Sequence, residues 1–284
     1  MAAESGRTTL PRPLLIFGVP TAGLLLVLLF MILGFPYDKL GDRIAERLLQ
    51  SGVRVEFDEI GPALRLAGPG LVVTGLRASV EGAETIQLQR ALVRPAWSSA
   101  WLRGSPALYT EIESESGAAQ GTVILGDRGA WNGTLTQVDV GALPLPANTP
   151  FGSLTGVIDA TVDLAMEEQR AKGSVTFDAV DGTLDLVSLP MSIPFETLSG
   201  DLTFGGNGYL TVNRLDVRGP AVNAGVTGNV LDATSFAAAP LRLEIAIDAE
   251  PAMIAAVRGA GVRIDRNGVG KARVTGTVAA PKIR

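Results

Sequence analysis

Residues 241–248 read LRLEIAID, a strict alternation in which every second side chain is leucine or isoleucine. Successive side chains of a β-strand point to opposite faces, so this period of two predicts a strand with one apolar face and one polar face. The same alternation recurs in residues 53–58, 158–166 and 174–178. Such strands are typical of antiparallel sheets with one solvated face. The sequence therefore predicts a mainly β protein built on a long antiparallel sheet.

A weak repeat interrupts the predicted strands: an apolar residue, Ser or Thr, Gly, any residue, and a second apolar residue. It occurs at residues 154–158, 198–202, 226–230 and 274–278, with a looser copy at 131–135. Glycine inside a strand indicates a bend or a close backbone approach, and repeated glycines curve a sheet. The alternation also slips at Asn213 and Arg214, which predicts a turn or a bulge there. We expect a curved sheet that forms either an open trough or a sandwich, because the period of two fits both.

Residues 14–35 read LLIFGVPTAGLLLVLLFMILGF and contain no charge. A helix of this length spans about 33 Å, enough to cross the hydrocarbon core of a bilayer. A cleaved signal peptide has a shorter apolar region and a small-residue cleavage site, neither of which is seen here. The sequence thus predicts a transmembrane helix over 14–35 and a cytoplasmic N-terminus over 1–13. Flanking basic residues on both sides leave the orientation undecided by charge.

Residues 36–52 predict an amphipathic helix. Tyr37, Leu40, Ile44 and Leu48 form one apolar stripe, and Gly52 is placed to end the helix. The stripe either lies on the membrane surface or seals one end of the following domain. The opposite face carries both signs of charge, which favours sealing.

Residues 53–284 are predicted to form a β-rich domain. The Pro-rich stretch at residues 142–151, ALPLPANTPF, is either a boundary between two β units or a crossing along the sheet edge. Two short helices are expected, at 95–102 (PAWSSAWL) and 250–260 (EPAMIAAVRGA). Residues 181–185 predict a hairpin turn, because Asp181 and Asp185 flank a glycine.

Two absences restrict the chemistry. The 284 residues include no Cys and no His, which excludes thiolate nucleophiles, Cys-type zinc sites and Ser-His-Asp hydrolases. The net charge is −5, which argues against nucleic-acid binding. Residues 36–284 hold 22 Lys and Arg against 28 Asp and Glu, which predicts no polybasic patch for anionic lipids.

No residue is proposed as catalytic, cofactor-binding or metal-binding. Glu111, Glu113 and Glu115 stand two residues apart, but a calcium site needs six to eight oxygens and usually a loop. A solvated strand face is the better interpretation. We therefore expect a protein that is not an enzyme and needs no cofactor.

The order of these features resembles the type II secretion system protein N family (GspN), in its longer form from delta-proteobacteria. The resemblance runs through the apolar segment, residues 35–40 (FPYDKL), 51–56 (SGVRVE) and 70–76 (GLVVTGL), and the closing residues 274–282 (VTGTVAAPK). The chain is more distantly similar to the AsmA-like proteins. The resemblance covers nearly the whole chain from residue 14. It depends on the order of the motifs along the chain.

This resemblance implies a single-pass protein of the inner membrane with a periplasmic domain at residues 53–284. The expected function is that of a non-enzymatic component of a type II secretion system. Its expected partners are the secretin or other inner-membrane secretion proteins. The alternative is an AsmA-like module that binds or transfers phospholipid in an apolar β-trough. The sequence leaves the oligomeric state open.

Overall fold

The structure is a computed structural model of the 284-residue chain. It describes residues 26, 30, 34–50, 52–65, 68–80, 85–97, 104–125, 129–142, 151–167, 170–186, 192–231, 238–259, 261–278 and 280–284.

All the strands of the described residues belong to one 17-stranded antiparallel sheet. The first eight are β1 (Val53–Glu56), β2 (Glu59–Arg65), β3 (Gly68–Val80), β4 (Ile86–Pro95), β5 (Ala107–Ser114), β6 (Gly117–Ile124), β7 (Ala130–Asp139) and β8 (Phe151–Leu154). The next five are β9 (Val157–Glu167), β10 (Arg170–Leu186), β11 (Ser192–Gly205), β12 (Leu210–Arg218) and β13 (Val222–Val230). The last four are β14 (Leu241–Ala249), β15 (Arg263–Ile264), β16 (Val269–Gly276) and β17 (Pro281–Ile283).

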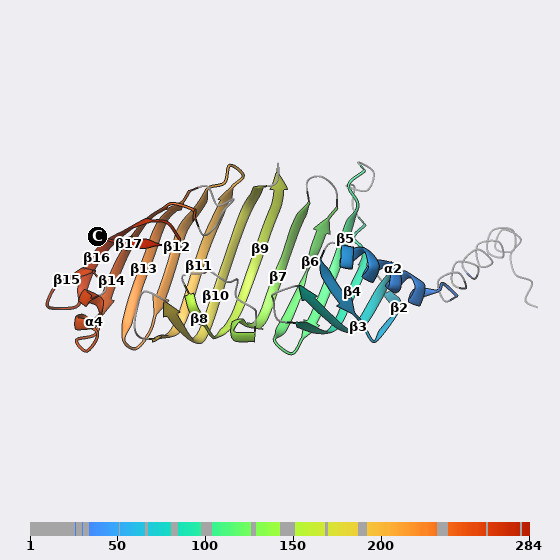
Figure 1. Cartoon of the computed structure of the whole chain (residues 1–284), viewed down its shortest axis with the longest axis horizontal. Helices are drawn as coiled ribbons and strands as arrows, with labels where there is room; N and C mark the ends of the chain where they lie inside the picture. The colour runs from blue at the N-terminus through green and yellow to red at the C-terminus, as the bar shows by residue number, and fades with distance from the viewer. Residues whose placement is uncertain are drawn as a thin grey trace, which may run out of the picture.

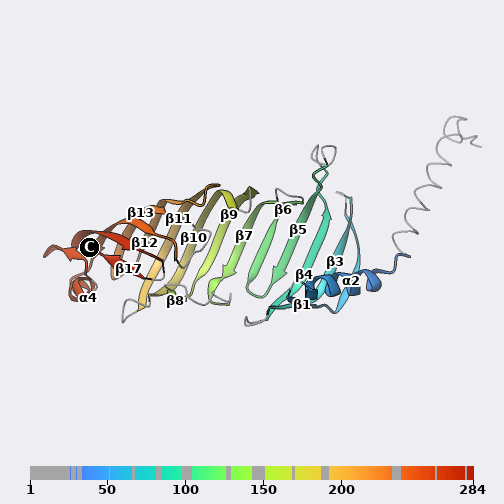
Figure 2. The same cartoon turned by 45° about the horizontal axis from the view of Figure 1, so that its top comes forward.

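Most of the sheet is a meander in which strands adjacent in sequence pair with each other (Figure 1). β1 and β2 both pair with β3, and the order then continues through β4, β5, β6, β7, β9 and β10. It goes on through β11, β12, β13, β14 and β16, and β15 and β17 pair with β16 at the far edge. β8 pairs with the end of β10. At about 4.8 Å per row the sheet is roughly 60 Å long, and Figure 2 shows its twist.

The predicted bulge is confirmed. β12 shifts register against β13 between Val212 and Leu215, and it shifts against β11 at the same place. Because of this extra residue in β12, the apolar side chains before the bulge (Val212) and after it (Leu215) lie on the same face of the sheet.

The predicted hairpin turn at residues 181–185 is wrong. β10 runs without reversal from Arg170 to Leu186 and stays paired with β11 on both sides of Asp181. Asp181 takes a left-handed backbone conformation, with φ of +52°, and Gly182 fits against Phe195. The Asp-Gly pair therefore lies within a continuous strand, because pairing with the long partner β11 continues on both sides of it.

Among the described residues, two α-helices and the short 3-10 helix η1 (Val140–Ala142) accompany the sheet. α2 (Tyr37–Gln50) confirms the predicted amphipathic helix, and it contacts β1 and β2 at the first edge of the sheet. Gly41 is buried there, and a Cβ on it would lie 2.3 Å from Cζ of Phe57. α4 (Ile254–Gly259) confirms the short helix expected within 250–260. Gly52 follows α2 with φ of +82°, as expected of a C-terminal cap.

Three predictions fall largely outside the described residues. The first is the predicted transmembrane segment 14–35. Within the described part of the chain, no helix is both long and apolar enough to span a bilayer. The helix expected at 95–102 is another: Pro95 ends β4, and residues 98–103 lie outside. Of the Pro-rich stretch, residues 143–150 lie outside, but β7 pairs directly with β9, so the ladder continues past it.

Candidate functional site

One face of the sheet, here called the apolar face, is uncharged over most of its length. Its members are register partners across successive strands, so they share one side of the sheet. They include Leu108 and Ile112 (β5), Val123 (β6), Trp131 and Leu135 (β7), Val162 and Leu164 (β9), Val175 and Phe177 (β10), Leu198 and Leu202 (β11), Val212 and Leu215 (β12), Val226 (β13), Leu243 and Ile245 (β14), and Ala272 and Val274 (β16). From β5 to β16, the regularly paired positions on this side carry no charged residue.

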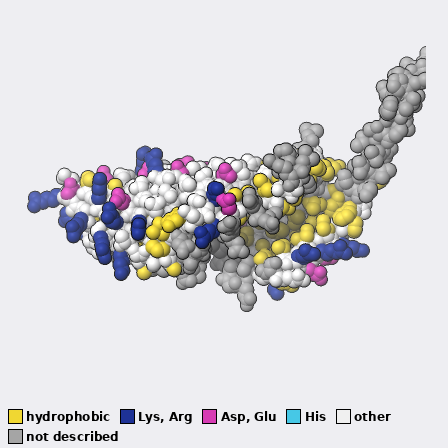
Figure 3. Space-filling view, turned by 90° about the horizontal axis from the view of Figure 1, so that it is seen from above, with side chains coloured by type: hydrophobic (Ala, Val, Ile, Leu, Met, Phe, Trp, Pro, Cys, Tyr) yellow, Lys and Arg dark blue, Asp and Glu magenta, His cyan; other side chains and the backbone are white. Residues whose placement is uncertain are grey.

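The apolar face is only partly buried. Val175, between its register partners Val162 and Leu202, is half-buried in the middle of the sheet. Among the described residues no large side chain is less than 2% exposed. Figure 3 shows hydrophobic side chains gathered in a hollow over the half of the sheet next to α2. The described strands thus supply one layer with an accessible apolar side.

Closed packing is found where loops and α4 fold over the apolar face. One cluster joins Leu210, Val230 and Leu241 near the strand ends with Ala239 and Val278 from the connections. A second cluster is formed by the strands themselves: Ala179 of β10 packs with Phe195 and Leu198 of β11, and Leu154 of β8 packs against them. A third places Ile254 and Val257 of α4 with Val262, Ile264 and Ala272 at the last strands. These clusters lie along the sides and at the C-terminal end of the face.

Glycine lets aromatic side chains lie against the sheet. Gly121 and Gly133 are register partners, and a Cβ on Gly121 would lie 2.7 Å from Nε1 of Trp131. The repeat glycines Gly133, Gly200, Gly228 and Gly276 all lie on the apolar side. Gly133 and Gly200 therefore leave gaps on this side into which neighbouring aromatic rings pack, as the Phe177 ring does at Gly200.

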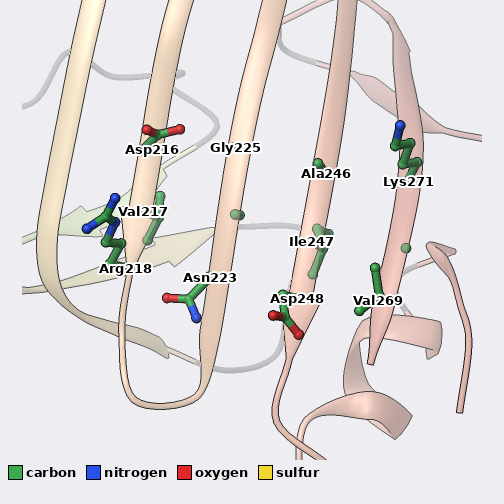
Figure 4. Close-up of a pocket in the computed structure, with 12 residues that line it drawn as sticks. Asp216, Val217, Arg218, Asn223, Gly225, Ala246, Ile247, Asp248, Val269 and Lys271 are labelled. Carbon is green, nitrogen blue, oxygen red and sulfur yellow. The ribbon is translucent and has the colours of Figure 1, made fainter. Parts of the chain in front are cut away.

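The opposite side, here called the polar face, carries the charged partners of the alternation. A shallow depression of about 470 Å³ lies there over β12, β13, β14 and β16, with Gly225 and Ala246 among its lining residues. Figure 4 shows Asp216, Arg218, Asp248 and Lys271 around it. Both signs of charge are present in the lining, so the depression has no clear preference for one charge.

Basic residues gather on the polar face at the last edge of the sheet. Arg263, Lys271, Arg273, Lys282 and Arg284, here called the basic patch, are brought together by the pairing of β15, β16 and the chain end at β17. The prediction of no polybasic patch is therefore wrong, because net charge averages over a sheet whose ends differ. The missed signal lies in residues 258–284, which hold seven basic residues and one acidic residue.

The three glutamates considered for calcium are not brought to one site. Glu111 and Glu113 lie on β5, whereas Glu115 lies in the turn before β6. Glu113 Oε1 is 3.7 Å from Nη1 of Arg90. The described residues contain no group of three acidic residues close enough to hold a metal ion.

One carboxyl group has a shifted pKa. The Ser153 hydroxyl donates a hydrogen bond to Oδ2 of Asp185, linking β8 to β10. Hydrogen bonding from Ser153 and then Ser192 lowers the pKa of Asp185 below its usual value. Since each hydroxyl donor favours the ionised form, the cluster stabilises a charge at the strand end.

No protein-family model, curated protein or solved structure matches this chain.

Proposed function

We propose that the apolar face is an open trough that binds the acyl chains of membrane lipids, as the resemblance to AsmA-like proteins implies. The observation that carries this proposal is a charge-free face that crosses the sheet from β5 to β16 and stays half-buried in its middle. Exposed apolar area of this extent is costly in water and marks a binding surface. Acyl chains are ligands that need no polar partner from the protein.

The dimensions suit such a ligand. Strand β9 has 11 residues and is about 36 Å long, at roughly 3.3 Å per residue. One acyl chain reaches about 15 Å, half of a hydrocarbon core of roughly 30 Å. Acyl chains therefore fit across the strands while the polar headgroup stays at the margin. Gly121 and Gly133, a register pair beside the ring of Trp131, add no side chain to this part of the apolar face.

The rest of the proposal follows from the sequence. Residues 14–35 would anchor the protein in the inner membrane and place residues 53–284 in the periplasm. The protein would act by binding, without catalysis and without a cofactor. A component of a type II secretion system is the competing proposal, and it requires protein partners on the same surfaces.

Site-specific photocrosslinking of the full chain in its native membrane tests the proposal. A benzophenone amino acid is placed at Ile112, Val175 or Ile245 on the apolar face. The matched controls carry it at the neighbouring Glu111, Thr176 and Glu244 on the polar face. After irradiation, the purified protein is examined for covalently bound phospholipid.

We expect phospholipid adducts at the three apolar positions and few at the controls. Equal labelling of both faces, or no lipid adducts, would overturn the proposal. Adducts of defined protein mass at the apolar positions would instead support a secretion-system component.

A further inference from the structure

The basic patch contains like charges placed directly opposite each other. Arg263 is the register partner of Lys271. Arg273 and Arg284 exchange both of their backbone hydrogen bonds, each at 2.9 Å, so they also face each other across the edge. Like charges directly opposite in a sheet are destabilising. A local arrangement that opposes folding indicates a function that uses it.

Nearby acidic residues offset the patch only in part. Glu244 Oε1 lies 2.8 Å from Nη2 of Arg273. The register partner of Lys271 on β14 is Ala246, and that of Lys282 is Thr275. Asp265 Oδ1 accepts hydrogen bonds from the backbone of Asn267 and Val269. Asp248 lies further along the same face, opposite Val269. The patch therefore keeps a strong net positive charge.

The patch is exposed and has a shape that accepts phosphate groups. Its five side chains are all exposed to solvent. Lys271, Arg273 and Arg284 line a shallow depression of about 840 Å³, which Thr227, Thr275 and the carboxylate of Glu244 also line. Basic side chains beside hydroxyl groups suit the oxygens of a phosphate. Figure 3 shows Lys and Arg side chains along this end of the molecule, opposite to α2.

We propose that the basic patch docks the C-terminal end of the sheet on a membrane rich in anionic phospholipid. The proposal rests on the lipid-binding function proposed above, because β16 carries the patch on one side and Ala272 and Val274 of the apolar face on the other. Docking would bring the C-terminal end of the sheet, where α4 and the connections cover the apolar face, to a lipid surface. This end is roughly 60 Å along the sheet from α2, the helix that follows the predicted membrane anchor in the sequence.

Vesicle recruitment tests docking with the full chain. The protein is held in phosphatidylcholine nanodiscs, so that its predicted anchor is already occupied. Flotation then measures its binding to vesicles of pure phosphatidylcholine or of phosphatidylcholine with phosphatidylglycerol. The test variant is Lys271→Gln with Arg284→Gln. The matched control is Arg170→Gln with Arg218→Gln, which removes two exposed charges from other strands.

We expect binding to the anionic vesicles only, weakened by salt. Each cation near an anionic surface contributes about fivefold, so the test variant should bind roughly 30-fold more weakly. Its thermal stability should be unchanged or higher, since repulsion is relieved. Equal binding to both vesicles, or full binding by the test variant, would overturn the proposal. If polyglutamate displaced the protein from the vesicles as readily as added phosphatidylglycerol did, the docking proposal would be overturned in favour of an acidic protein partner.

Failure of docking is distinguishable from failure of the lipid-binding proposal. Photocrosslinking at Val175 should be the same in the test variant as in the unchanged protein, because Val175 lies on β10, several strands from the patch. Loss of recruitment with lipid adducts retained separates the two functions.

Discussion

Phe177 on β10 lies directly opposite Gly200 on β11, and a Cβ on Gly200 would fall 2.3 Å from Cε1 of the Phe177 ring. The ring therefore occupies the space that a side chain at residue 200 would take. Gly200 belongs to the LSGDL copy of the repeat at residues 198–202. The repeat glycine thus has a packing reason here: it seats an aromatic side chain within the apolar face.

Gly200→Ala should destabilise the protein by about 1–3 kcal/mol, the usual cost of overpacking. The ring of Phe177 or the two strands must move to make room. Urea unfolding of the full chain in detergent, followed by tryptophan fluorescence, measures the loss. Gly61→Ala is the control, because no atom lies within 4 Å of its added Cβ. Equal effects of the two variants would contradict the packing explanation.

Val175→Asp should lower the phospholipid that co-purifies with the protein several-fold. A charge in the centre of the apolar face must stay hydrated, and hydration displaces acyl chains. Thr176→Asp places the same charge on the polar face of the same strand and should leave the lipid content unchanged. Mass spectrometry of extracted lipid gives both values. An undiminished lipid content in Val175→Asp would count against a trough at this position.

Ser153→Ala should reduce stability more at pH 7 than at pH 3. The hydroxyl donors lower the pKa of folded Asp185 below its unfolded value. The resulting stabilisation is present above the unfolded pKa of about 3.9 and is lost as the pH falls through the folded pKa. Urea unfolding at the two pH values gives the comparison. Ser174→Ala, on the polar face of β10, should show no such pH dependence.

Arg258→Met should loosen the C-terminal end of the sheet. Nη2 of Arg258 donates to the carbonyl oxygens of Ile264 and Asp265, at 3.2 and 2.9 Å, and so ties α4 to β15. Loss of these two hydrogen bonds should lower the local stability of this end of the sheet by about 1 kcal/mol. Hydrogen exchange of the amides in β15 and β16 should accelerate, while β9 and β10 stay unchanged. Arg266→Met, in the following turn, removes the same charge and should leave the exchange slow.

Much of the architecture could be predicted from the sequence because alternation is a local property. The strand at 241–248, the helix before Gly52 and the bulge at Asn213 each follow from the order of neighbouring residues. The turn at Asp181 was mispredicted for the same reason. An Asp-Gly pair favours reversal locally, but pairing along β11 keeps the strand running.

Sequence alone thus determined that one side of each strand is apolar, since the side-chain period of a strand is fixed by its backbone geometry. It did not determine what, if anything, covers that side, because covering depends on contacts between residues far apart in the chain. Only the tertiary structure placed the described strands in one sheet and left Val175 half-buried. The same holds for charge: net charge is a sum over the chain, whereas the basic patch exists because antiparallel pairing sets Arg263 beside Lys271 and Arg273 beside Arg284.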